Sequence, residues 1–167
     1  MILRHAKAEN NRPGKRDFDR ALSERGSRAA SQIGKALLGR GLEPELALCS
    51  PALRTRQTLA LVDAEFGGQT ECRFVDDIYN AEPEELMEIV REHGQSASPL
   101  LVVGHNPGLH LLALSIAGSG PAADLEAMQA RFPTCALAIF EVAIENWRGL
   151  GRNIAILQAY LRPRELV

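Results

Sequence analysis

Short apolar runs alternate with amphipathic segments along most of this 167-residue chain, and that alternation restricts the fold more than any other feature. Residues 100–103 (Leu-Leu-Val-Val) form the clearest run and predict a buried strand, as do residues 46–49. Apolar residues at helical spacing predict helices over 23–38, 53–66 and 83–94. Because strands and helices take turns, we expect a mostly parallel central sheet with helices on both faces.

The rest of the chain fits the same plan. Ile2-Leu3 reads as the end of a strand, residues 73–75 as a weak strand, and Pro107 as the start of a helix that continues to Ile116. Two late apolar runs, 136–142 and 154–161, predict an antiparallel pair at an edge of the sheet. With no internal repeat or linker, the prediction is one three-layer α/β/α domain over residues 1–167, without a large cap insertion.

Composition excludes several classes of protein. Apolar residues make up 46% of the chain and charged residues 24%, which is ordinary for a soluble globular protein. No stretch approaches the roughly 18 apolar residues of a membrane span, and residues 1–5 leave no room for a signal peptide's apolar region, so we expect a cytoplasmic protein. Three cysteines, far apart, predict free thiols rather than a disulfide framework or a metal site.

Positive charge is concentrated near the start of the chain. Residues 1–28 hold eight basic and four acidic side chains, although the whole chain carries a net charge of −2. The basic side chains are Arg4, Lys7, Arg12, Lys15, Arg16, Arg20, Arg25 and Arg28. A locally basic segment in an acidic protein suits an anionic ligand better than nucleic acid, which usually demands a strongly basic domain. For residues 12–16 alone, a solvated loop of alternating charge is the favoured interpretation.

Two histidines and two arginines follow the predicted strands. Arg4 and His5 come after the first apolar run, Arg54 after the second and His105 after residues 100–103. Ligands of such sheets bind beyond the carboxyl ends of the strands, where these side chains would meet. A neutral imidazole can attack phosphorus, and the planar guanidinium of arginine binds two phosphate oxygens. The set therefore indicates phosphoryl chemistry, with either histidine as the nucleophile.

Other residues have plainer interpretations. His93 precedes Gly94 at a predicted helix end, where a histidine favours the helix dipole, and His110 lies in an apolar helix. Neither forms a metal-ligand pattern with His105, so we predict no metal and no other cofactor. Arg20 has two equal interpretations, a contact with the phosphate or substrate and a salt bridge to a neighbouring aspartate.

Four motifs occur in a distinctive order: residues 3–8 (Leu-Arg-His-Ala-Lys-Ala), 19–26, 50–58 and 104–108 (Gly-His-Asn-Pro-Gly). Together they resemble the histidine phosphatase superfamily, which is phosphoglycerate mutase-like in fold and named for an Arg-His-Gly tripeptide. The chain looks most similar to the compact SixA-type phosphohistidine phosphatases, over nearly its whole length. The tail at 160–166 resembles endings of this branch as well.

The resemblance implies a role for each site residue. His5 would be the nucleophile that becomes phosphorylated, and Arg4, Arg54 and His105 would bind the phosphoryl group. No cofactor is implied. The structural alternative for each residue alone is a satisfied core histidine or a surface arginine.

The chain departs from the family pattern in two places. Only three residues precede Arg4, so either the first strand is short or the true start lies upstream. Many family members place a glutamate general acid where this chain has Asn80. Glu82 is our candidate substitute, whereas Glu84 and Glu85 fit the first turn of the following helix.

The missing acid bears on the substrate. An alkoxide leaving group needs a proton from a well-placed acid, whereas phosphohistidine departs as imidazole, whose conjugate acid has a pKa of about 6.5. A pocket without a cap also suits a phosphohistidine on a folded protein partner. We therefore expect a protein phosphohistidine phosphatase that uses neither membrane nor nucleic acid. The alternatives are a phosphomonoesterase for a small metabolite, with Glu82 as acid, and a non-catalytic phospho-binding module; a mutase is less favoured.

Overall fold

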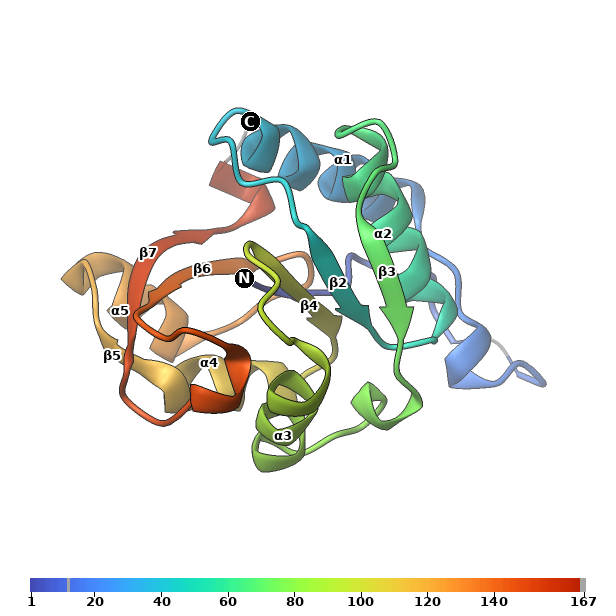
Figure 1. Cartoon of the computed structure of the whole chain (residues 1–167). Helices are drawn as coiled ribbons and strands as arrows, with labels where there is room; N and C mark the ends of the chain where they lie inside the picture. Colours follow the sequence, from blue (N-terminus) through green and yellow to red (C-terminus); the bar gives the residue numbers. More distant parts are fainter. Residues whose placement is uncertain (12, 166–167) are drawn as a thin grey trace.

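A seven-stranded sheet lies at the centre of the protein, with its strands in the order β3-β2-β4-β1-β6-β7-β5 (Figure 1). The computed structural model describes residues 1–11 and 13–165; Arg12 of the basic segment and Leu166 of the tail motif lie outside them. The strands are β1 Ile2–Arg4, β2 Leu46–Cys49, β3 Glu71–Phe74, β4 Leu100–Gly104, β5 Ala117–Ser119, β6 Leu137–Val142 and β7 Ala155–Leu161.

Four neighbouring strands, β3, β2, β4 and β1, are parallel, as the alternation of strands and helices predicted. Their register pairs Leu3 with Val103 and Leu48 with Val102. Every residue of β2 and β4 is buried, which explains their continuous apolar sequences. The parallel register brings the carboxyl ends of β1, β2 and β4 to a common edge of the sheet.

Helices cover both faces of the sheet and complete the predicted three-layer α/β/α architecture (Figure 1). They are α1 Glu24–Leu38, α2 Leu53–Ala64, α3 Pro83–His93, α4 Gly108–Ile116 and α5 Ala122–Ala130, with short 3-10 turns at η1 Asp17–Asp19, η2 Asp76–Ile78, η3 Trp147–Gly149 and η4 Pro163–Glu165. On one face, Ile33 of α1 and Val62 of α2 pack with Leu3 and Val103. On the other, α3, α4 and α5 share a second apolar cluster with Val102.

The helix starts follow from capping chemistry. Ser23 caps α1, since its Oγ accepts a hydrogen bond from the Gly26 N–H at 3.2 Å. Pro83 opens α3, and the Glu85 carboxylate accepts a bond from the Glu82 N–H at 2.8 Å. Both starts agree with the sequence prediction.

The positions of β6 and β7 in the sheet differ from the prediction. β6 and β7 are antiparallel as expected, but β6 pairs with β1 inside the sheet rather than lying at an edge. The edge strand is β5, which pairs in parallel with β7 and, like α5, had no counterpart in the sequence analysis. The sequence concealed β5 because its Ala-Gly-Ser residues are poor strand formers that directly follow the apolar helix α4.

Within residues 1–11 and 13–165, no helix combines the length and apolarity needed to cross a bilayer. The three cysteines are free, with Cys49 and Cys135 buried and Cys72 exposed.

Candidate active site

Two histidines meet at the edge where β1, β2 and β4 end. His5 follows β1, and its N–H donates to the Gly104 carbonyl at 3.0 Å, so its backbone is held against the end of β4. His105 follows β4, and the two imidazole rings lie 5.2 Å apart between centroids. Ser50 lies directly after β2 beside them, and its backbone N–H donates a hydrogen bond to the Val103 carbonyl at 3.0 Å. The structure thus brings together the histidines that the sequence placed at strand ends.

His5 is held with one particular ring nitrogen free. Its Nδ1 lies 2.8 Å from the Ala6 carbonyl oxygen, which only accepts, so Nδ1 carries the hydrogen and Nε2 keeps its lone pair. Burial, followed by the positive charges of Arg54 and Arg4, lowers the pKa of His5 to about 4, although the Ala6 hydrogen bond opposes this. His5 is consequently neutral at pH 7, which a nucleophilic imidazole requires.

Arg54 lies in the first turn of α2 and is the most buried cation of the site, at 4% exposure. Its Nη2 donates to Nδ1 of His105 at 3.2 Å and to the Asp17 carboxylate at 2.9 Å, while Nη1 donates to the Asp17 carbonyl at 2.8 Å. Arg4 donates to the Phe132 carbonyl at 2.8 Å. The Nε atoms of both arginines are buried and have no hydrogen-bond acceptor among the described residues.

Hydrogen bonds also fix the tautomer of His105. Because Arg54 donates to Nδ1, the hydrogen of the neutral ring lies on Nε2, which donates to Ser50 Oγ at 2.8 Å. Burial, then the charges of Arg54 and His5, lowers the pKa of His105 to about 3. His105 therefore offers an N–H donor without a charge of its own.

Asp17 and Tyr79 join the site without having been predicted. The Asp17 carboxylate accepts bonds from Arg54 and, at 3.0 Å, from the Tyr79 hydroxyl. Tyr79 also sets its ring edge-on to His105, with 5.2 Å between centroids. Partial burial opposes it, but the Tyr79 hydrogen bond and the charges of Arg54 and Arg20 leave the pKa of Asp17 below its usual value. Asp17 is thus an ionised anchor for the arginines at pH 7.

Arg20 makes one of the salt bridges that the sequence allowed. Its Nε lies 2.8 Å from Asp17 Oδ1, while Asp19 pairs with Arg16 at 2.7 Å instead. Arg20 is therefore linked to Arg54 through Asp17, which contacts both arginines.

Glu82 is exposed at the N-cap of α3. Its loop lies against the start of α4, since a Cβ on Gly108 would come 2.0 Å from the Ala81 carbonyl oxygen. Among the described residues, no hydrogen bond or ion pair links the Glu82 carboxylate to the histidines or arginines of the site. Asn80, which the resemblance places where many family members have an acid, is also exposed and has a φ of 61°.

The two remaining histidines lie elsewhere. His93 ends α3, with Nε2 4.0 Å from a Glu92 carboxylate oxygen. His110 lies on α4 with Nε2 2.7 Å from the Met128 carbonyl. The described part of the chain contains no cluster of three or more His, Cys, Asp or Glu side chains that could hold a metal ion.

Comparison with known proteins agrees with this geometry. The family described as "Histidine phosphatase superfamily (branch 1)" matches residues 1–80, which include His5 and Arg54. An uncharacterised protein of Mycobacterium tuberculosis (strain CDC 1551 / Oshkosh) is 35% identical over 165 residues, covering 97% of this chain and 100% of that protein.

Two solved structures are similar over almost their whole length. A proposed phosphohistidine phosphatase SixA from Agrobacterium tumefaciens has a TM-score of 0.81 and 31% identity, covering 97% of this chain and 96% of that one. Its counterpart from Nakamurella multipartitia has a TM-score of 0.83 and 28% identity, covering 97% and 95%. The chain therefore belongs to the histidine phosphatase superfamily, in its compact SixA-type branch.

Proposed function

We propose that this phosphatase hydrolyses phosphohistidine in proteins, through a covalent intermediate on His5. The observation that carries the proposal is the state of His5, which is neutral, with its Nε2 lone pair free, and lies beside Arg4, Arg54 and His105. A nucleophile flanked by fixed cations is what phosphoryl transfer requires, because its catalysis consists largely of positioning and charge stabilisation.

The first step transfers the phosphoryl group to His5. Nε2 of His5 forms a bond to phosphorus as the P–N bond of the substrate breaks. The bonding pair stays on the nitrogen that leaves, and because the other ring nitrogen of the substrate carries a proton taken from solvent, the ring departs as neutral imidazole. Arg4 and Arg54 bind the phosphoryl oxygens, and the Nε2–H of His105, still oriented by Ser50, also donates to another of them.

The second step releases phosphate. The oxygen of a water molecule forms a bond to phosphorus, and the bond between phosphorus and His5 breaks. Nε2 recovers its lone pair, and the protons of the water leave with inorganic phosphate and the solvent. His5 is regenerated neutral, with Nδ1 still bonded to the Ala6 carbonyl.

Phosphohistidine is a suitable substrate for a site whose carboxylate is ionised and cannot donate a proton. Asp17, the carboxylate bonded into the site, has a lowered pKa and is ionised, so it holds no proton to donate at pH 7. The substrate ring can take its proton from solvent rather than from an acidic side chain, because protonated imidazole has a pKa of about 6.5, and it then leaves as neutral imidazole. The 31% identical relative from Agrobacterium tumefaciens, itself a proposed phosphohistidine phosphatase, supports the same substrate class.

A small phosphomonoester is the second candidate substrate, with Glu82 as general acid. It is favoured by the packing of Ala81 against Gly108, which holds the loop before Glu82 beside the helix that follows His105. An alkoxide leaving group would need that proton.

Comparing substrates separates the two candidates. We expect faster turnover of a phosphohistidine protein than of any member of a panel of sugar and nucleotide phosphates, and little effect of Glu82→Gln on it. Strong preference for a metabolite, lost in Glu82→Gln, would replace the proposal by the second candidate. Undiminished hydrolysis by His5→Ala would falsify the nucleophile assignment, and phosphate binding without hydrolysis of any substrate would indicate a binding module.

A further inference from the structure

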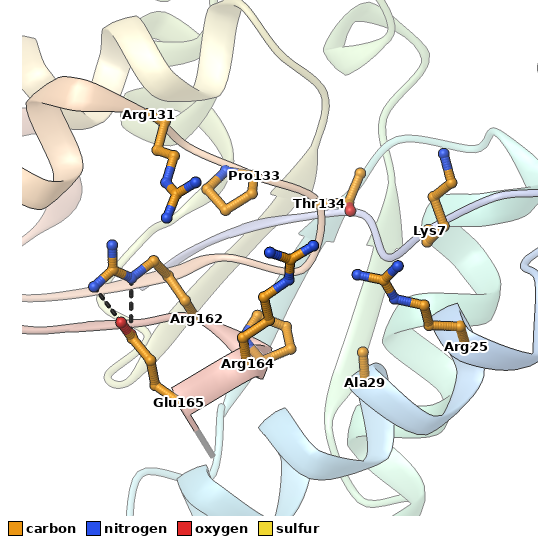
Figure 2. Close-up of a pocket in the computed structure, with 10 residues that line it drawn as sticks. Lys7, Arg25, Ala29, Arg131, Pro133, Thr134, Arg162, Arg164 and Glu165 are labelled. Carbon is orange, nitrogen blue, oxygen red and sulfur yellow. Dashed lines mark hydrogen bonds and ion pairs between the residues drawn. The ribbon is translucent and has the colours of Figure 1, made fainter. Parts of the chain in front are cut away.

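A pocket with basic walls opens beside the active site. Its volume is about 320 Å³, and Figure 2 shows the side chains that surround it. The charged residues lining it are Lys7, Arg25, Arg131, Arg162, Arg164 and Glu165. Five cations and one carboxylate leave this pocket strongly positive in a chain whose net charge is −2.

The pocket lies at the same edge of the sheet as His5. Lys7 is two residues beyond His5, and the wall on the other side includes Thr134. The next residue, Cys135, donates its N–H to the His5 carbonyl at 3.0 Å. In the register of β6 and β7, Leu161 pairs with Leu137, which brings the arginines after β7 to this edge.

Backbone contacts fix the Lys7 side of the pocket onto α1. The N–H and the hydroxyl of Ser23 each donate to the Lys7 carbonyl at 2.9 Å. Gly26 packs so closely that a Cβ there would lie 2.0 Å from the same oxygen. Lys7 and Arg25, from different segments, are therefore held beside the same pocket.

Most of this charge has no partner within the protein. Arg162 donates to Glu165 at 2.8 Å, the one carboxylate of the pocket. Among the described residues, the side chains of Lys7, Arg25, Arg131 and Arg164 form no ion pair with an acidic side chain. In Figure 2 the side chain of Arg25 extends from α1 toward that of Arg164. Gathering like charges in this way destabilises the free protein, so an anionic ligand would relieve it.

Exposure indicates the kind of ligand. Arg54 in the phosphate site is buried and fixed by three hydrogen bonds, whereas Lys7, Arg25, Arg131 and Arg164 are all exposed. Exposed cations discriminate poorly between small anions, but they steer and orient an oppositely charged protein surface.

We propose that this basic pocket docks an acidic surface of the phosphorylated protein, next to the phosphohistidine that enters the His5 site. This inference rests on the proposed function and specifies in addition that the substrate protein is acidic around its phosphohistidine. The phosphatase would select a phosphohistidine with acidic residues beside it over one in neutral surroundings.

The test uses two synthetic peptides of equal length, each with one histidine phosphorylated by phosphoramidate. Glutamates flank the histidine in one peptide and glutamines in the other. At low salt we expect kcat/KM for the acidic peptide to be about tenfold higher, with the difference shrinking as salt is added. Arg131→Glu combined with Arg164→Glu should abolish that preference and change turnover of the neutral peptide less than about twofold.

A matched control reverses the same number of charges elsewhere. Arg40 and Arg148 are exposed and lie near the opposite edge of the sheet, so Arg40→Glu with Arg148→Glu should keep the preference. Thermal unfolding of both double variants establishes that they fold.

The outcomes separate the two proposals. Equal turnover of both peptides by the unaltered protein would overturn the docking proposal and leave the proposed function standing. In that case, strong inhibition by pyrophosphate that is lost in the Arg131/Arg164 variant would assign the pocket to a small polyanion. An equal loss of preference in the control variant would also overturn it, since net charge would then explain the effect. Failure to hydrolyse either peptide would overturn the proposed function, and the docking proposal with it.

Discussion

Asp17 holds Arg54 from two sides: its carboxylate accepts a hydrogen bond from Nη2 at 2.9 Å, and its backbone carbonyl accepts one from Nη1 at 2.8 Å. The same Nη2 also donates to His105. A carboxylate thus sits against the guanidinium that would bind a phosphoryl group. Arg54 is therefore oriented before the substrate arrives, and an entering anion shares it with Asp17.

Asp17→Ala should destabilise the free protein and strengthen its response to phosphate. We expect a loss of about 1 kcal/mol in the free energy of unfolding, since the Asp17 side chain is 45% exposed and its ion pair with Arg54 is partly screened. Added orthophosphate should raise the melting temperature of the variant more than that of the unaltered protein, because the site has lost a negative charge. Asp19→Ala, which removes a carboxylate paired with Arg16, serves as control. A smaller phosphate effect in Asp17→Ala would contradict this account of Arg54.

The two histidines of the site should stay neutral far below the ordinary pKa of imidazole. The pKa of His5 is lowered to about 4 and that of His105 to about 3, so neither ring should gain a proton near pH 6.5. Nitrogen-15 NMR of the imidazoles measures this directly, and it also reports whether Nδ1 of His5 and Nε2 of His105 carry the hydrogens. Titration of both rings near 6.5 would show that burial does not control their charge.

Stability should depend on pH through the same groups. Between about pH 6.5 and about 4 the unfolded chain binds a proton at His5 that the folded protein does not, so the free energy of unfolding falls as the pH falls through this window. Above the window the full stability is present. Urea unfolding at several pH values gives the free energy of unfolding at each pH. Between about pH 6.5 and about 4 this free energy should change less steeply with pH in His5→Asn than in the unaltered protein. The same pH dependence of the free energy of unfolding in both proteins would contradict this role of His5.

Ser50→Ala should impair catalysis through His105. Ser50 is fully buried, and its Oγ accepts the Nε2–H bond that orients the ring. We expect kcat to fall roughly tenfold with KM changed less, because a misoriented donor mainly weakens the transition state. Ser27→Ala, which removes a hydroxyl bonded to the Ser23 carbonyl on α1, is the control. A change confined to stability would mean that Ser50 only fills space.

The parts of the site that the sequence predicted are those tied to strand ends. Arg4, His5 and His105 adjoin buried apolar runs, so strand periodicity and the rule for parallel sheets were enough to bring them together. Asp17 begins the short 3-10 turn η1 and Tyr79 directly follows η2, and the position of these turns depends on packing such as that of Phe18 against Tyr79. The only sequence signal was the spacing of Asp17 and Arg20, which fits a salt bridge as well as a site.

Contacts far apart in the chain account for the other differences. β6 lies inside the sheet because β1 has only one parallel neighbour, β4, and its other edge pairs with Leu137 and Ala138. No local pattern near residue 137 records that pairing. The basic pocket likewise draws its cations from four segments, so the sequence alone indicates only the excess charge near the start of the chain.

The most direct test of the account is to trap the phosphorylated enzyme and locate its phosphate. The protein is mixed with a phosphohistidine peptide, denatured within the first turnovers at alkaline pH, where phosphohistidine survives, and digested for mass spectrometry. The account predicts one phosphoryl group, on His5, and none in the His5→Asn variant. Phosphate on His105, or turnover without any phosphorylated His5, would contradict it.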